Sequence, residues 1–317
     1  MSDYYGLPTA VLENSFLRLE YLAGAGPRIV RLAPPGKPNL LAELPDFRVE
    51  TPNGPFFFRG GHRLWRAPES LAETYRPDNE GQVVEKLADG VRLSWAGGGG
   101  ITKSIELRLA PDRAALSLLH ELHNTTGATV TLAPWALTQF RLGGTAILPQ
   151  PVGNADPAGL LANRLLVLWP YTRLGDPRLV LRDDCLLIHA APDAHPVKVG
   201  TYNSHGWLAY WLDGTLFRKT FDVRPGASYP DGGCNSESYC NDRFVELESL
   251  GPLETLAAGG TARLVETWEL YPDLEQDFLP PGVAELVRSL DRKGEGGAPR
   301  SSSPRRDGKP GELTEMS

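Results

Sequence analysis

Cysteine is scarce in this sequence: its 317 residues include three, Cys185, Cys234 and Cys240. A sparse, odd set does not make the disulfide framework of a small secreted protein, so we expect a reducing compartment. The start, MSDYYGLPTAVLEN, lacks the basic and apolar regions of a secretory signal. No apolar run approaches the roughly 18–20 residues that span a bilayer. These absences predict a cytoplasmic protein without a membrane partner.

An excess of positive charge is also missing, because 39 acidic residues outnumber 32 basic ones and the net charge is −7. Nucleic-acid binding needs concentrated positive charge, so we do not expect a nucleic-acid partner. The sequence has no phosphate-binding or dinucleotide glycine pattern and no nucleophile elbow. The oligomeric state stays open.

The histidines and cysteines do not follow a metal-ligand pattern. His120 and His123 lie in a stretch that alternates like a strand, where residues three apart point in opposite directions. Cys234 and Cys240 are too far apart for a zinc knuckle, and no second ligand pair accompanies them. We therefore predict no metal site.

Glycine and proline, by contrast, are abundant, with 34 and 28 residues and no repeating period. This composition is typical of many turns between short strands. Apolar and polar residues alternate in the stretch 16–24, where Leu17, Leu19 and Tyr21 share one face. The pattern predicts an all-β chain that forms one large antiparallel β-sandwich with few short helices.

Three hairpins are predicted from this alternation and from the turns between the strands. The clearest contains Asp213-Gly214, a pair suited to a type I′ turn. The predicted strand pairs are 103–109 with 114–124, 206–212 with 215–223, and 243–250 with 261–270.

The C-terminal part has a different pattern. Residues 281–293 carry apolar side chains at helical spacing behind a proline, which predicts a helix. The stretch 294–317 has almost no large apolar residues and is predicted to be a disordered tail, whose short basic patch is solvated. We therefore expect a single domain over residues 1–293.

Several segments together resemble the aldose 1-epimerase superfamily, in the order in which they occur there. They are AGPRIVRL at 25–32, RGGHRLWRAPE at 59–69, the strand-loop-strand 118–140, and 244–271, which contains FVELESLGP. The resemblance covers most of residues 10–275 and implies the galactose mutarotase-like sandwich, with a sugar cleft on one sheet face. In that family the strand after the loop carries a histidine that protonates the ring oxygen of the sugar. Here this strand is PWALTQF, 134–140, without histidine, so His62 or another residue would have to take the role.

Glu246 and Glu248 are the candidate catalytic acids, on the strand that resembles the family's catalytic-glutamate strand. They alternate with Val245 and Leu247, so both carboxylates project from one sheet face if the aliphatic pair enters the core. Two adjacent acids repel, which raises one pKa and suits a general base. The alternative is an ordinary solvent-exposed face.

The segment around His62 has the densest set of functional residue types. Its paired glycines would let a ligand approach the backbone, and tryptophan and arginine offer the stacking and hydrogen bonds that sugars need. A structural turn closed by an Arg66–Glu69 ion pair is the alternative. We predict that the substrate-binding residues are Arg28, Arg63, Trp65, Arg66, Glu69, Lys198, Trp207 and Lys219.

Two of these have a plain structural alternative. Arg28 could brace a turn, and Lys219 could belong to a solvated strand face, whereas a lysine in a cleft would suit an acidic sugar.

These observations lead to a carbohydrate-binding protein related to aldose epimerases. In the active form a glutamate takes the proton of the anomeric hydroxyl and His62 or a neighbour protonates the ring oxygen. No cofactor is needed, because both steps are proton transfers. The alternatives are a sugar-binding module that has lost catalysis, and a sandwich that binds no sugar.

Overall fold

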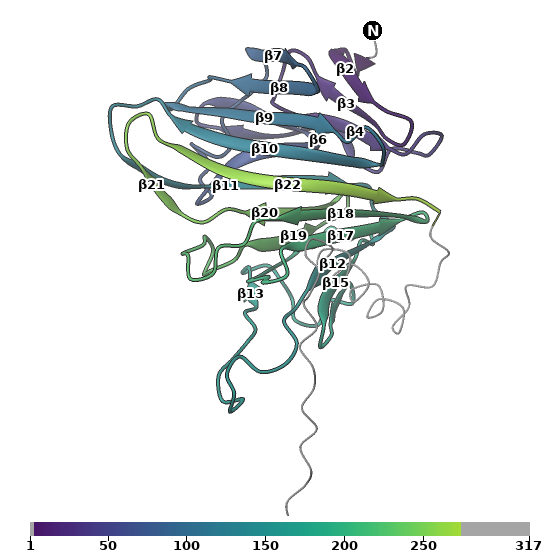
Figure 1. Ribbon diagram of the computed structural model, residues 1–317, viewed down its shortest axis with the longest axis vertical. Helices are drawn as coiled ribbons and strands as arrows, with labels where there is room; N and C mark the ends of the chain where they lie inside the picture. Colours follow the sequence, from purple (N-terminus) through teal and green to yellow (C-terminus); the bar gives the residue numbers. More distant parts are fainter. Residues whose placement is uncertain (1–2, 274–317) are drawn as a thin grey trace, which may run out of the picture. The chain divides into compact units, whose positions relative to one another are not determined.

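Two antiparallel sheets make up the structure, which is a computed structural model that describes residues 3–273 (Figure 1). These residues fall within a compact unit that spans Met1–Asp277. They form strands and turns without any helix, and thus no helix that could cross a membrane. The predicted all-β sandwich is confirmed. The predicted helix at 281–293 and the predicted tail lie outside the described residues.

The first sheet has twelve strands in the order β1-β2-β3-β4-β6-β11-β20-β19-β16-β13, with β5 paired to β6 and β21 to β11. Its strands are β1 (Asp3–Tyr4), β2 (Leu7–Glu13), β3 (Arg18–Leu22), β4 (Ile29–Ala33), β5 (Glu43–Thr51), β6 (Gly54–Ala67), β11 (Val130–Phe140), β13 (Val167–Leu168), β16 (Val197–Thr201), β19 (Ser236–Cys240), β20 (Val245–Leu250) and β21 (Glu254–Leu256).

The second sheet has ten strands in the order β14-β15-β12-β17-β18-β22-β10-β9-β8-β7. Its strands are β7 (Gln82–Leu87), β8 (Gly90–Trp95), β9 (Ile101–Leu109), β10 (Ala115–Asn124), β12 (Thr145–Pro149), β14 (Leu179–Leu181), β15 (Cys185–His189), β17 (Trp207–Leu212), β18 (Thr215–Phe221) and β22 (Thr261–Tyr271).

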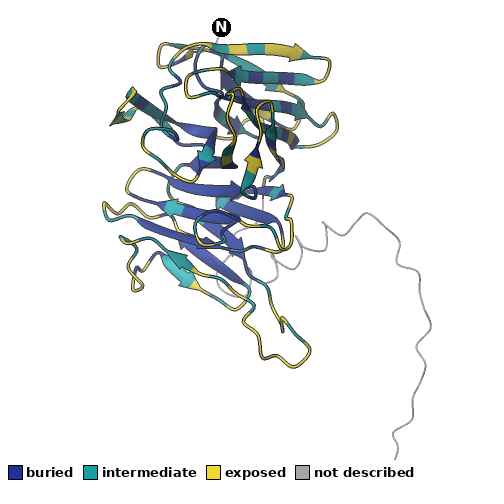
Figure 2. Cartoon of the chain, turned by 90° about the vertical axis from the view of Figure 1, so that its left-hand side faces the viewer, coloured by how far each residue is buried: buried dark blue, intermediate teal, exposed yellow. Residues whose placement is uncertain are grey.

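The core lies between the sheets and takes alternate residues from both. Leu19 and Leu247 come from the first sheet, and Leu118, Phe217 and Trp268 come from the second. Figure 2 shows this burial along the strands, with exposed residues concentrated in turns. The three cysteines are buried and unpaired.

Two of the three predicted hairpins are confirmed. β9 pairs with β10, and β17 pairs with β18 around Asp213 and Gly214, both with positive φ as a type I′ turn requires. The third prediction is wrong, because β20 pairs with β11 and β19 while β22 lies in the other sheet beside β10 and β18. The connection through β21 therefore carries the chain from one sheet to the other.

A bulge in β6 determines which of its side chains face the core. Arg59, Gly60 and Gly61 all have positive φ, and a Cβ on Gly60 or Gly61 would lie 1.9 Å from the carbonyl oxygen of Ala42 or Ile29. The paired glycines thus let backbone approach backbone, not a ligand. The irregularity shifts the alternation of side chains along β6. Even-numbered Phe58 before it and odd-numbered Trp65 after it face the same pocket.

Candidate functional site

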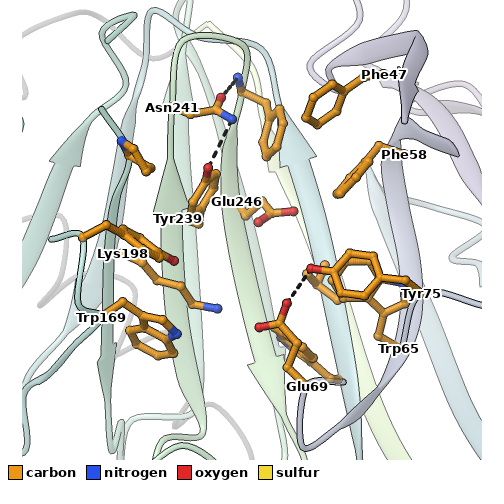
Figure 3. Close-up of a pocket in the computed structure, with 15 residues that line it drawn as sticks. Phe47, Phe58, Trp65, Glu69, Tyr75, Trp169, Lys198, Tyr239, Asn241 and Glu246 are labelled. Carbon is orange, nitrogen blue, oxygen red and sulfur yellow. Dashed lines mark hydrogen bonds between the residues drawn. The ribbon is translucent and has the colours of Figure 1, made fainter. Parts of the chain in front are cut away.

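The candidate site is a pocket of about 330 Å³ on the face of the first sheet that points away from the core (Figure 3). Nine of its fifteen lining residues are aromatic, and the charged ones are Glu69, Lys198 and Glu246. The aromatic residues are Phe47, Phe58, Trp65, Tyr75, Trp135, Trp169, Tyr171, Tyr239 and Phe244. Flat apolar walls combined with a few charged groups are typical of small-molecule sites.

Packed rings hold the pocket's shape. Trp65 lies with its ring centroid 4.6 Å from that of Tyr75 and 5.3 Å from that of Trp135, on the neighbouring strand. Trp65 and Trp135 are directly opposite each other in the β6–β11 ladder. Both are buried and belong to a small apolar cluster on this outer face, which gives the pocket a rigid floor.

Glu246 projects into this pocket, as Figure 3 shows. Its strand alternates as predicted, with Val245 and Leu247 in the core. Glu246 Oε1 accepts hydrogen bonds from Arg63 at 3.0 Å and from Gln139 at 2.9 Å. Burial, together with the charge of Glu248, raises the pKa of Glu246 to about 7, although Arg63 opposes the shift. A carboxylate with such a pKa can accept and return a proton near neutral pH.

Lys198 lies across the pocket from Trp65 and Tyr75 (Figure 3). It is held between two tryptophans and two carboxylates. Its Nζ is 2.7 Å from Glu237 Oε2 and 3.0 Å from Glu248 Oε2. The ammonium also lies 4.4 Å from the ring centroid of Trp169 and 4.8 Å from that of Trp135. Burial opposes its charge, but Glu237 and Glu248 raise the pKa of Lys198 well above its usual value. Lys198 therefore stays an ammonium.

The two carboxylates beneath Lys198 face each other across adjacent strands. Glu237 of β19 is the register partner of Glu248 of β20, and both are fully buried. Glu248 Oε2 also accepts a hydrogen bond from the Trp135 indole at 2.9 Å. Burial raises the pKa of Glu237 well above its usual value, although the Lys198 ammonium beside it opposes the shift and favours the carboxylate. The pair thus anchors the Lys198 ammonium against the floor of the pocket.

Glu69 lies at one edge of the pocket beside Tyr75, whose hydroxyl donates a short hydrogen bond to Glu69. Burial, reinforced by Glu69, raises the pKa of Tyr75 above its usual value, so its hydroxyl keeps its proton. The Arg66–Glu69 ion pair considered as the alternative does not form, because Arg66 pairs with Glu73 at 3.2 Å. Glu69 is left to face the pocket.

His62 does not reach this pocket. After the bulge in β6 its side chain points between the sheets, where it is fully buried, while Arg63 and Trp65 face outward. His62 bonds Thr138 Oγ1 at 3.0 Å and His120 Nε2 at 2.8 Å. Burial holds the pKa of His62 well below its usual value, further lowered by His120. A neutral imidazole on the far side of the sheet cannot protonate a sugar in the pocket.

The tautomers of the two histidines follow from their partners. His120 Nδ1 lies 3.1 Å from the Leu264 carbonyl, which only accepts, so Nδ1 carries the hydrogen. Neutral His120 then accepts at Nε2 from His62, and Thr138 donates to His62 Nδ1. Glu266 lies close enough for the three ligand atoms to fall within 4.8 Å of one another. Its carboxylate already accepts from Ser249 and Trp268 and pairs with Lys219, so we interpret the cluster as a hydrogen-bond network between the sheets.

Lys219 is likewise inside the sandwich and not in the cleft. From β18 in the second sheet its Nζ donates to Ala136 O at 3.2 Å and Leu247 O at 3.0 Å in the first sheet. It also pairs with Glu266 at 3.3 Å. Lys219 is not on a solvated strand face either, because residues on both faces of β18 are buried.

Three further predicted binding residues lie away from the pocket. Arg28 is buried and pairs with Asp78 at 2.9 Å, so it braces the turn before β4. Arg66 is held by Glu73. Trp207 lies on the face of β17 opposite the core residues Leu208 and Tyr210, with the guanidinium of Arg218 5.9 Å from its ring centroid.

Comparisons with known proteins agree with this architecture. No protein-family model matches the chain, and no curated protein sequence does. Solved structures do match. A galactose mutarotase-like protein from Lactobacillus casei ATCC 334 aligns with a TM-score of 0.54 and 15% identity over 83% of this chain and 100% of that chain. Another from Clostridium acetobutylicum aligns with a TM-score of 0.51 and 9% identity over 86% and 97% of the two chains. The chain has the galactose mutarotase-like fold.

Within this galactose mutarotase-like fold, the strand expected to carry a histidine offers none. The outward face of β11 presents Trp135, Leu137 and Gln139. None of these exchanges a proton near neutral pH. Among residues 3–273 no histidine lines the pocket.

The sequence reasoning placed Glu246, Trp65, Glu69 and Lys198 in the site, and the structure brings these four to one pocket. Arg63 and Glu248 stand directly behind them. The sequence did not point to most of the aromatic residues that line the pocket, nor to Glu237. The motif SESYC at 236–240 alternates like a strand, and pairing it with VELESL would have set Glu237 opposite Glu248.

Proposed function

We propose that the pocket binds a carbohydrate and that the protein interconverts its anomers. The observation that carries this proposal is the placement of Glu246, a buried carboxylate with a pKa near 7, at the floor of an aromatic pocket. Aromatic faces bind the apolar face of a sugar ring, and the charged groups bind its hydroxyls. The fold, shared with galactose mutarotase-like proteins, supports the same assignment.

The chemistry requires a base and a proton donor on different sides of the sugar. In the proposed reaction the Glu246 carboxylate accepts the proton of the anomeric hydroxyl. The bond between the anomeric carbon and the ring oxygen breaks, and its electron pair stays on the ring oxygen. That oxygen is an alkoxide once the ring opens and is a stronger base than an amine, so it takes a proton from the Lys198 ammonium even though Glu237 and Glu248 raise the pKa of Lys198. Ring closure on the other face returns both protons, so no cofactor or net proton is consumed.

Replacing Glu246 by glutamine removes the base and keeps a similar shape. We expect the rate of anomer exchange to fall by 10²–10⁴-fold, the usual contribution of a general base, while sugar binding persists. NMR exchange or polarimetry on freshly dissolved α-aldoses measures the rate, and calorimetry measures binding. Glu254→Gln, a surface acid paired with Arg224, is the matched control. An unchanged exchange rate in Glu246→Gln would exclude this mechanism.

The rate should depend on pH through Glu246. A base works only when ionised, so activity should rise with pH and level off above about 7. In Glu248→Gln the like charge is gone, and the rising limb should move to lower pH, while the part due to burial remains. A pH series of exchange rates for both proteins checks this. A limb that stays in place in Glu248→Gln would show that Glu248 does not act on the base.

The second candidate is a sugar-binding module without catalysis. The absence of a histidine among the described residues of the pocket favours it. Saturable binding in a thermal-shift or calorimetric screen, together with anomer exchange at the uncatalysed rate, would establish this alternative. No shift with any sugar would exclude both.

A further inference from the structure

A second hollow of about 530 Å³ adjoins the site pocket. The two share four lining residues, Phe47, Phe58, Glu69 and Tyr75, which we call the rim. Only the second pocket contacts Arg48, Val49, Ser70 and Leu71. Strands β5 and β6 and the segment after β6 therefore build parts of both pockets.

The rim is a packed unit and not a loose partition. Phe47 and Phe58 lie with ring centroids 4.7 Å apart, and Phe58 lies 6.1 Å from Tyr75. The Tyr75 hydroxyl is fixed by its hydrogen bond to Glu69. A ligand that occupies both pockets would therefore lie across these four side chains.

The chemistry of the second pocket suits a sugar ring. Phe47 and Tyr75 offer aromatic surface, and Ser70, Glu69 and Arg48 supply donors and acceptors for hydroxyls. Arg48 has a half-exposed side chain that pairs with the exposed Glu50 and lies 5.8 Å from the ring centroid of Phe57, so turning toward a ligand would break only two weak surface contacts. One cation and one anion leave the pocket without the net positive charge that a phosphate would require.

Apolar surface in the second pocket is left uncovered. Leu71 is 49% exposed, whereas Phe56, Leu64 and Trp65 of the neighbouring strand β6 are buried. Contact with a ligand would cover it. The volumes of both pockets lie within the range typical of small-molecule sites, so each can take one sugar ring.

We propose that the ligand is a disaccharide or longer oligosaccharide, with its reducing ring in the site pocket and its second ring across the rim in the second pocket. This proposal rests on the proposed function, because it assigns the first ring to the same pocket. It names the class of carbohydrate that the protein selects.

The test compares monosaccharides with disaccharides on the full chain. Calorimetric titrations would use D-glucose against maltose and cellobiose, and D-galactose against lactose. At least one disaccharide should bind about tenfold more tightly than its monosaccharide. Two variants block the second pocket from the segment after β6, Ser70→Trp and Leu71→Arg. Each should remove the gain and leave monosaccharide affinity within twofold. Leu161→Arg, at a leucine that is 67% exposed and outside both pockets, is the control.

The outcomes separate the two proposals. Monosaccharide binding without any gain for the disaccharides would overturn the second pocket and keep the proposed function. A gain that survives both blocking variants in folded protein would also overturn it. Failure of every sugar to bind would overturn both.

Discussion

Replacing Lys198 by methionine is expected to lower the free energy of unfolding by about 3–5 kcal/mol, the cost of leaving a buried charge without its partner. Lys198 is the cation between Glu237 and Glu248, and both carboxylates are fully buried. The same change removes the proposed proton donor, so anomer exchange should be lost as well. Urea unfolding measures the stability, and NMR exchange measures the activity.

The loss of stability in Lys198→Met should grow with pH. Lys198 holds the pKa of Glu237 down against burial, so without the ammonium the pKa of Glu237 in the folded protein rises further above its unfolded value. A raised carboxyl pKa favours the folded state at low pH, and this contribution is lost as pH rises through the folded pKa. The deficit should therefore be larger at pH 8 than at pH 5. Lys37→Met, which breaks an exposed pair with Asp273, should change stability by less than about 1 kcal/mol. An equal deficit at both pH values would contradict the buried pairing.

Replacing Lys219 by methionine is expected to destabilise the protein by a similar amount, about 3–5 kcal/mol, for a different reason. Its ammonium joins the two sheets through the carbonyl oxygens of Ala136 and Leu247, and it pairs with Glu266 of its own sheet; all three partners are buried. Without it, Glu266 remains as an uncompensated charge between the sheets. Thermal and urea unfolding measure the effect.

Two comparisons make the Lys219 prediction specific. The double variant Lys219→Met with Glu266→Leu should recover part of the loss, because replacing a buried ion pair by apolar groups is often nearly neutral. Lys86→Met, at an exposed position of β7, should stay within about 0.5 kcal/mol. Because Lys219 lies on the far side of the sheet from the pocket, folded Lys219→Met should bind sugar with unchanged affinity. A selective loss of sugar binding would return Lys219 to the site.

Local alternation was sufficient for much of the architecture. In β20 the order of VELESL places Val245 and Leu247 on one face and Glu246 and Glu248 on the other, whatever strands lie beside it. The Asp213-Gly214 turn likewise fixes its hairpin, because the positive φ values it needs are a property of those two residues.

The alternation of apolar and polar residues does not predict where an irregularity exchanges the two faces of a strand. The residue order around His62 suggests a ligand-facing segment, and Trp65 of this segment does line the pocket, with Arg63 behind it. The bulge at 59–61 decides that His62 itself points inward, and it exists because Ala42 and Ile29 approach the glycines from elements distant in the chain. A one-residue shift moves every side chain to the other face.

Local residue order is sufficient for the strand-rich fold, the type I′ hairpin and the common face of Glu246 and Glu248. Long-range packing places β22 in the second sheet, makes Lys219 a bridge between the sheets, and brings Glu237 to Glu248 beneath Lys198. The division has one physical cause. Side-chain period and turn conformation are set by neighbouring residues, whereas pairing partners and burial depend on contacts between residues far apart in the chain.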